Sequence, residues 1–125
     1  MRWIKIDRVT AIHDRQIAEH GGQAGVRDIG LLESALARPQ NIKAYEPDAD
    51  ISRLAAAYAF GIVRNHPFLD GNKRTGYVVM DTFLIKNGFR LEATVVDKYI
   101  TFLSLAEGSL SEEELAAWLR ERVVS

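Results

Sequence analysis

Ten consecutive residues, Leu54 to Val63, contain no charged side chain and are almost entirely apolar. The run is too short to span a bilayer, which takes about 20 residues. A helix that is apolar nearly all round is typical of the middle of a domain. We therefore predict a central helix that starts at Asp50 or Ser52 and ends near Asn65. His66 precedes Pro67, and the residue before a proline is driven out of the helical region.

A second, mostly buried helix is predicted from about Gly71 to Asn87, stopped by Gly88. Amphipathic helices surround the pair, and the predicted ranges are Asp7 to His20, Ile29 to Arg38 (capped by Asp28 and closed by Pro39), Val96 to Ala106, and Ser111 to about Val123. Trp3 to Ile6 is predicted as a short strand or arm, Gln40 to Asp50 as a loop or small hairpin, and Phe89 to Ala93 as extended. The fold class is all-α, with at most minor β-structure.

The length of 125 residues indicates one domain over the whole chain, 1–125. The absence of cysteine excludes a disulfide framework, thiolate zinc sites and a cysteine nucleophile. A net charge of −1 argues against general attraction to nucleic acid or to an anionic membrane. The N-terminus lacks the apolar stretch of a signal peptide. We expect a cytoplasmic protein with no direct nucleic-acid binding and no membrane binding.

The connector between the two buried helices, Arg64 to Thr75, is unusually rich in polar groups. It holds a histidine, an aspartate and three cations near the centre of the predicted domain. Because burial of an unpaired charge costs several kcal/mol, a connector of this kind indicates a site.

The end of this connector favours phosphate. Gly71 and Asn72 open a helix, where free backbone N–H groups and the dipole attract anions. Lys73 and Arg74 lie in the same first turn, where a cation is unfavourable by roughly 0.3–1 kcal/mol. A bound polyphosphate would reverse that sign.

Two further residues suit group transfer. Asp70 can hold Mg²⁺, which usually takes one or two carboxylates together with phosphate oxygens. His66 carries an imidazole, which titrates near neutral pH and can accept a proton from an attacking hydroxyl. Taken singly, each residue also has a structural interpretation: Asp70 as a helix cap, Phe68 as a core anchor, and Lys73 with Arg74 as a solvated face.

The segment from His66 to Arg74, HPFLDGNKR, resembles the signature of the Fic/Doc family. The Fic pattern is His-x-Phe-x-(Asp/Glu)-Gly-Asn-Gly-x-Arg, and Doc-type members end in Asn-Lys-Arg, as here. Gly22 to Pro39 is similar to the corresponding stretch of death-on-curing proteins. Nearly the whole chain, about 2–122, can be laid on such a protein by length and helix order.

The resemblance implies a Fic-type helical bundle that uses ATP and Mg²⁺. Fic proteins mostly transfer AMP to a hydroxyl of a target protein. Doc toxins act as kinases on elongation factor Tu, inhibit translation, and are neutralised by a cognate antitoxin. By position, His66 is the general base and Asp70 the Mg²⁺ ligand, and the nucleotide-binding residues are Gly71, Asn72, Lys73 and Arg74.

The resemblance also implies that residues 40–50 form a flap that aligns the target segment, by strand addition. Gly71, where an alanine is familiar in Doc, and Pro67 are more Fic-like. These two departures leave AMP transfer open as the alternative to phosphate transfer.

Two unrelated functions compete with these. His13 and Asp14 form the His-Asp pair of HD-type phosphohydrolases, although such a site needs further ligands at set positions. A catalytically silent helical binding module is the non-enzymatic alternative, but a degenerate site is expected to have lost the histidine or the acid. A Walker loop is excluded because its glycine spacing is absent.

Overall fold

The computed structural model describes residues 1–125 and confirms the all-α class. Its elements are α1 (Ile6–His20), α2 (Ile29–Tyr45), α3 (Ile51–Asn65), α4 (Asn72–Lys86), β1 (Arg90–Leu91), α5 (Val95–Glu107), α6 (Glu112–Arg120) and β2 (Val123–Val124). None of the six helices is long and apolar enough to cross a membrane.

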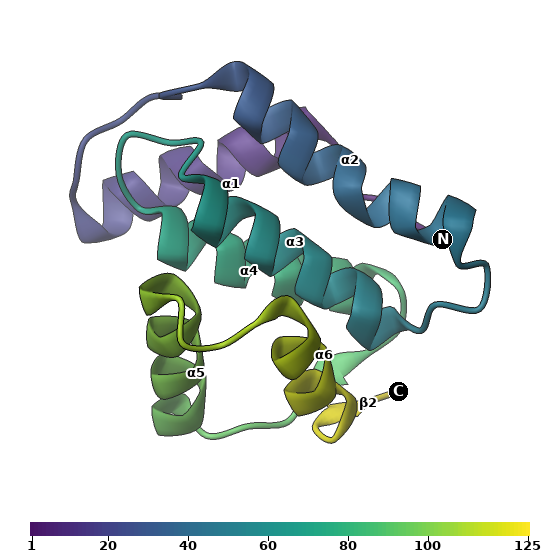
Figure 1. Ribbon diagram of the computed structural model, residues 1–125. Coiled ribbons are helices and arrows are strands. Elements are labelled where there is room, and N and C mark those ends of the chain that lie inside the picture. Colours follow the sequence, from purple (N-terminus) through teal and green to yellow (C-terminus); the bar gives the residue numbers. More distant parts are fainter.

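Helix α3 is the centre of the bundle, as its apolar sequence predicts. Figure 1 shows it running through the middle of the molecule, with α2 along one side, α4 behind it, and α5 and α6 below. Ten of its 15 residues are buried. Gly61 allows α2 to approach closely, because a Cβ there would lie 3.1 Å from the Cβ of Ala35. The 24 buried apolar residues of the protein form one core cluster around this helix.

The start of α3 is tied to the end of α6 by Asp50. Its Oδ1 accepts a hydrogen bond from the backbone N–H of Arg53 at 2.9 Å, which caps the helix. Both carboxylate oxygens also accept from the guanidinium of Arg120, at 2.6 and 3.1 Å. The hydrogen bond from Arg120 is the main reason that the pKa of Asp50 lies below its ordinary value.

Replacement of Asp50 by alanine is expected to lower the free energy of unfolding by about 0.5–2 kcal/mol, the usual cost of a lost N-cap. Asp50→Asn keeps the cap and loses only the ion pair, so its stability should lie between those of Asp50→Ala and the wild type. Because the folded pKa is depressed, the contribution of the charge is present above the unfolded pKa and is lost as pH falls through the folded pKa. Urea unfolding of the three proteins at neutral and acidic pH checks this order. An Asn variant as unstable as the Ala variant would contradict the capping role.

Helix α2 is longer than predicted. Pro39 does not close it at Arg38, and the helix continues to Tyr45 with Pro39 inside. Proline removes the hydrogen bond to the carbonyl four residues earlier, which usually breaks a helix. Here Pro39 and Ile42 are both buried, so tertiary packing of the second half outweighs the local penalty. The predicted loop over residues 40–50 is therefore wrong for its first half.

The chain ends also differ from the expectation. Residues 1–5 form no strand. Lys5 occupies the N-cap position of α1 without a side-chain capping hydrogen bond, and Asp7 lies inside the first turn instead of before it. The main anchor here is Ile4, which is buried and donates its N–H to Tyr58 Oη at 3.0 Å.

At the other end, α6 stops at Arg120, three residues earlier than predicted, although its capping box between Ser111 and Glu114 is confirmed. The last residues turn back and pair antiparallel with the extended segment after α4, Val124 opposite Arg90 and Val123 opposite Leu91.

Candidate active site

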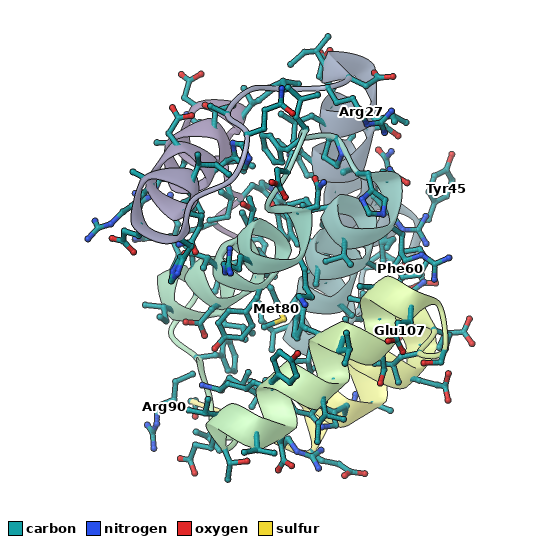
Figure 2. The ribbon with its side chains drawn as sticks, turned by 90° about the vertical axis from the view of Figure 1, so that its left-hand side faces the viewer. Arg27, Tyr45, Phe60, Met80, Arg90 and Glu107 are labelled. Atoms are coloured by element: carbon teal, nitrogen blue, oxygen red, sulfur yellow. The ribbon has the colours of Figure 1, made fainter.

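The predicted catalytic loop, residues 66–74, begins where α3 ends in a constrained turn. His66 adopts the left-handed conformation (φ 50°, ψ 55°) and is the one residue other than glycine with positive φ. That conformation costs a non-glycine residue roughly 1–2 kcal/mol. Arg27 donates to the carbonyl oxygens of His66 and Asn65, at 2.7 and 2.9 Å, and so stabilises the turn. Figure 2 places Arg27 toward one end of the molecule and Arg90 toward the other, with Met80 between them.

The segment between α1 and α2 pairs with this loop along its backbone. Val26 forms an antiparallel bridge with Phe68. The N–H groups of Arg27 and Asp28 donate to Pro67 O at 2.8 and 3.1 Å, and Leu69 N–H donates to Gly25 O at 3.1 Å. From the sequence, the segment from Gly22 to Pro39 is related to the site only by its resemblance to death-on-curing proteins. The structure shows that residues 25–28 of this segment hydrogen-bond directly to the loop.

The Asp70 carboxylate is held by backbone amides at the open end of the loop. Gly71 N–H donates to Oδ1 at 2.9 Å, and Gln23 N–H donates to Oδ2 at 3.3 Å. Gly22 makes this approach possible, since a Cβ there would lie 2.8 Å from Oδ2. A carboxylate has about four lone-pair positions, so two remain to bind a cation.

Asn72 is buried, and its side chain hydrogen-bonds to the backbone of the loop. Its Oδ1 accepts from Phe68 N–H and its Nδ2 donates to Phe68 O, both at 3.0 Å. The same amide nitrogen lies 3.5 Å from His66 Nδ1. Asn72 therefore ties the first residue of α4 back to the middle of the loop and to the candidate base.

All six predicted site residues border one hollow of about 300 Å³, which His66, Leu69, Asp70, Gly71, Asn72, Lys73 and Arg74 line. The hollow lies at the N-terminus of α4, where Gly71, in the left-handed conformation (φ 75°), is the cap residue. The free N–H groups and the positive end of the helix dipole meet there. The structure thus brings the residues together, and their chemical roles stay predictions.

Lys73 lines that hollow and also contacts α5. Its Nζ lies 5.4 Å from the ring centroid of Tyr99 on α5. Lys73 and Arg74 also border a second hollow of about 500 Å³ between α1, α4 and α5. We call this second hollow the α5 groove; its other lining residues are Gln16, His20, Tyr77, Val78, Val95, Lys98, Tyr99 and Phe102.

The donor set fits Mg²⁺ held together with a nucleotide. No group of three or more histidine, cysteine or acidic residues gathers anywhere in the protein, so there is no all-protein metal cage. Mg²⁺ commonly binds through one or two carboxylates and takes its remaining ligands from phosphate and water. Asp70 is the residue that would supply the carboxylate, and the helix N-terminus with Lys73 and Arg74 would face the phosphates.

The predicted flap needs correction. Residues 40–45 are the last turns of α2, and only Glu46 to Asp50 form a loop, with no strand to which a target segment could add. Beside this loop, a hollow of about 570 Å³ runs between α2 and α3, from Tyr45 and Glu46 to Asn65. It reaches the residue next to His66.

His13 and Asp14 do not form an HD-type site. His13 is buried, whereas Asp14 is exposed, and neither belongs to a ligand cluster. The His13 ring instead lies flat on Phe68, with centroids 3.8 Å apart, against the catalytic loop. Sequence reasoning missed the contributions of His13, Gly22 and Arg27 because their partners are about 40 to 60 residues away along the chain.

Comparison with known proteins agrees with this geometry. The Fic/DOC family model matches residues 3–84, which includes the whole catalytic loop. The chain therefore belongs to the Fic/Doc family.

Within that family it is similar to proteins of the Doc type. It is 33% identical to the protein kinase doc of Escherichia phage P1 over 120 residues, which cover 96% of this chain and 94% of the relative. It is 45% identical to the toxin Doc of Mycolicibacterium smegmatis over 91 residues, 70% of this chain and 68% of the relative.

Proposed function

We propose that this protein is the toxin of a toxin–antitoxin pair and transfers the γ-phosphate of ATP to a hydroxyl of a target protein, so that a phosphate ester forms on the target and ADP leaves. The observation that carries the proposal is the single hollow in which His66, Asp70 and the N-terminus of α4 meet. The names of the two relatives, a protein kinase and a toxin, support it. We further propose that the target is elongation factor Tu, that translation is inhibited, and that the protein acts in the cytoplasm.

Each group of residues that lines the hollow has a different role in the proposed reaction. His66 accepts the proton of the attacking hydroxyl, and its fixed backbone turn keeps the imidazole at the mouth of the hollow. Asp70 would hold Mg²⁺, which would neutralise phosphate charge. The N–H groups at the start of α4 and the cations Lys73 and Arg74 stabilise charge on the transferring group.

Lys73 favours phosphate transfer over AMP transfer. The Fic pattern has glycine at this position, which leaves the backbone open for the inner phosphates of ATP. A lysine fills that space and adds a charge, so we propose the reverse orientation, with the γ-phosphate nearest His66. Lys73 lines both the catalytic hollow and the α5 groove, with its Nζ beside Tyr99. AMP transfer by the same base is the alternative.

The direct test incubates the purified protein and ATP with lysate, followed by mass spectrometry of the lysate proteins. We expect one protein to gain the mass of a phosphoryl group on a serine or threonine, and elongation factor Tu to be that protein. A gain of the mass of AMP would favour the alternative activity. If the folded protein binds ATP but modifies no protein of the lysate, that result would contradict transfer altogether.

The α5 groove is the proposed docking site of the antitoxin. It is largely apolar, and its rim carries Lys73, Arg74 and Lys98. The neighbouring face of α5 exposes large apolar side chains, namely Val95, Val96, Tyr99 and Ile100. An apolar segment with acidic residues, folding as a helix on binding, complements such a groove. Its occupation would also cover Lys73 and Arg74, which border the catalytic hollow.

Two neighbouring valines test this site. Val95 lines the groove and Val96 does not, although both are strongly exposed on α5. We expect Val95→Asp to weaken binding of the cognate antitoxin about tenfold or more, since the substitution places a charge in an apolar contact. Val96→Asp should change the affinity much less. Calorimetric titration gives both values, and equal effects of the two substitutions would contradict docking in the groove.

A further inference from the structure

One histidine outside the predicted machinery is built into the wall of the site. His13, on α1, is only 1% exposed, whereas His20 and His66 are both exposed. Its ring stacks on Phe68 with an interplanar angle of 6°, and Phe68 is itself buried. The imidazole therefore has a fixed plane, set by a residue of the catalytic loop.

The polar edge of this ring meets the loop at one atom. His13 Nε2 lies 2.8 Å from the carbonyl oxygen of Asp70. A carbonyl oxygen only accepts hydrogen bonds, so the nitrogen must carry the proton and donate. His13 thus fixes the direction of one peptide carbonyl, and that carbonyl belongs to the residue that supplies the carboxylate.

The geometry of the peptide bond carries this constraint into the hollow. The C=O and N–H of a trans peptide lie in one plane and point in opposite directions. When the Asp70 carbonyl is held toward α1, the N–H of Gly71 must point the other way. It does so: Gly71 N–H donates to Asp70 Oδ1 at 2.9 Å, at the edge of the hollow that both residues line.

Gly71 makes the peptide easy to rotate without such a bond. Glycine adopts positive and negative φ with similar ease, and here φ is 75°. Rotation of the Asp70–Gly71 peptide would break the hydrogen bond from Gly71 N–H to Asp70 Oδ1 and turn a carbonyl oxygen toward the hollow, where it would repel phosphates. The stack on Phe68 and the bond to Asp70 O oppose that rotation together.

We propose that His13 is a positioning residue of the phosphate-binding hollow, which holds the Asp70–Gly71 peptide so that its N–H stays on the Asp70 carboxylate and its carbonyl oxygen stays turned away from the nucleotide. The inference rests on the proposed function, because it assigns the hollow to the phosphates of ATP. His13 touches neither substrate nor metal in this account and acts only through the peptide.

Two substitutions separate the donor from the stacked ring. His13→Phe keeps an aromatic ring against Phe68 and removes the donor, whereas His13→Gln removes the ring and keeps an N–H that can reach a carbonyl. Asp14→Ala, at the adjacent exposed position of α1, is the matched control. Thermal unfolding of all variants shows which of them are folded.

The first readout is affinity for the non-hydrolysable analogue AMP-PNP with Mg²⁺, measured by calorimetry without any target protein. We expect His13→Phe to bind about tenfold more weakly, His13→Gln to recover most of the affinity, and Asp14→Ala to match the wild type. In turnover, His13→Phe should lower kcat roughly 10–100-fold with little change in KM for the target protein. A folded His13→Phe variant with wild-type nucleotide affinity would overturn the proposal.

The second readout needs no substitution. In the ¹⁵N spectrum of the wild-type protein at neutral pH, His13 should carry its proton on Nε2, protected from exchange. A proton on Nδ1 with a bare Nε2 would overturn the proposal even if every variant unfolded. If the wild type binds AMP-PNP but transfers no phosphate, the proposed function fails, while the affinities and the tautomer still decide the role of His13.

Discussion

Replacement of His66 by alanine is expected to lower the rate of transfer about 10²–10⁴-fold and to abolish growth arrest on expression. His66 is the one histidine that lines the hollow, and it is exposed, so its loss leaves no cavity. Alanine loses the base and leaves the pairing of Arg27 with the two backbone carbonyls available. A transfer assay with purified protein measures the rate, and growth curves after induction measure the arrest. Thermal unfolding is the control for folding.

The interpretation of this variant depends on its being folded and able to bind nucleotide. We expect a melting temperature close to that of the wild type and unchanged affinity for AMP-PNP with Mg²⁺. Full toxicity of a folded His66→Ala protein would contradict the assignment of the base.

Substitution of Gly22 by alanine is expected to lower transfer at least about 10²-fold without a change at any predicted catalytic residue. The added methyl group would lie 2.8 Å from Asp70 Oδ2 and 3.1 Å from its Cγ, so the carboxylate must move. The displaced carboxylate loses its hydrogen bond from Gln23 N–H and, with it, the position from which it would hold Mg²⁺.

Gly21 provides the matched control. It also has positive φ, 81°, but a Cβ there meets no atom within 4 Å. Gly21→Ala therefore carries a comparable backbone strain without the clash. We expect its activity to exceed that of Gly22→Ala by a wide margin, with the Mg²⁺ dependence of nucleotide binding changed only in the latter. Equal losses in the two variants would assign the effect to strain alone.

The helices of the core could be predicted from the sequence because their signals are local. The apolar run of α3, the capping residues Asp28, Asp50 and Ser111, and the glycine after α4 each act within a few residues. Pro39 wrongly predicts the end of α2. The penalty of a proline inside a helix is local, whereas the burial that outweighs it comes from packing of α2 against α3. The pairing of Val123 and Val124 with Arg90 and Leu91 joins segments about 30 residues apart, and short strands carry almost no periodic signal.

The candidate site also contains residues that the sequence could predict and residues that it could not. His66, Asp70 and Lys73 could be found because they lie in one short polar connector between apolar helices. The residues that hold this connector could not be found. Arg27 binds carbonyl groups 38 and 39 residues away, and His13 reaches Asp70 across 57 residues. His13 also looked like half of a metal-binding pair, because its burial and its partner are tertiary facts that no local pattern contains.

The central claim, that this protein transfers the γ-phosphate, is tested most directly with ATP labelled at either the α or the γ position. Each labelled form of ATP is incubated with the protein and with the unmodified target protein that mass spectrometry identifies. The label that enters the target is then measured. We predict label from the γ position only, because Lys73 replaces the glycine that, in the Fic pattern, leaves the backbone open for the inner phosphates. His66→Ala should give no label from either form. Label that enters the target from the α position only would contradict the proposed orientation and establish AMP transfer.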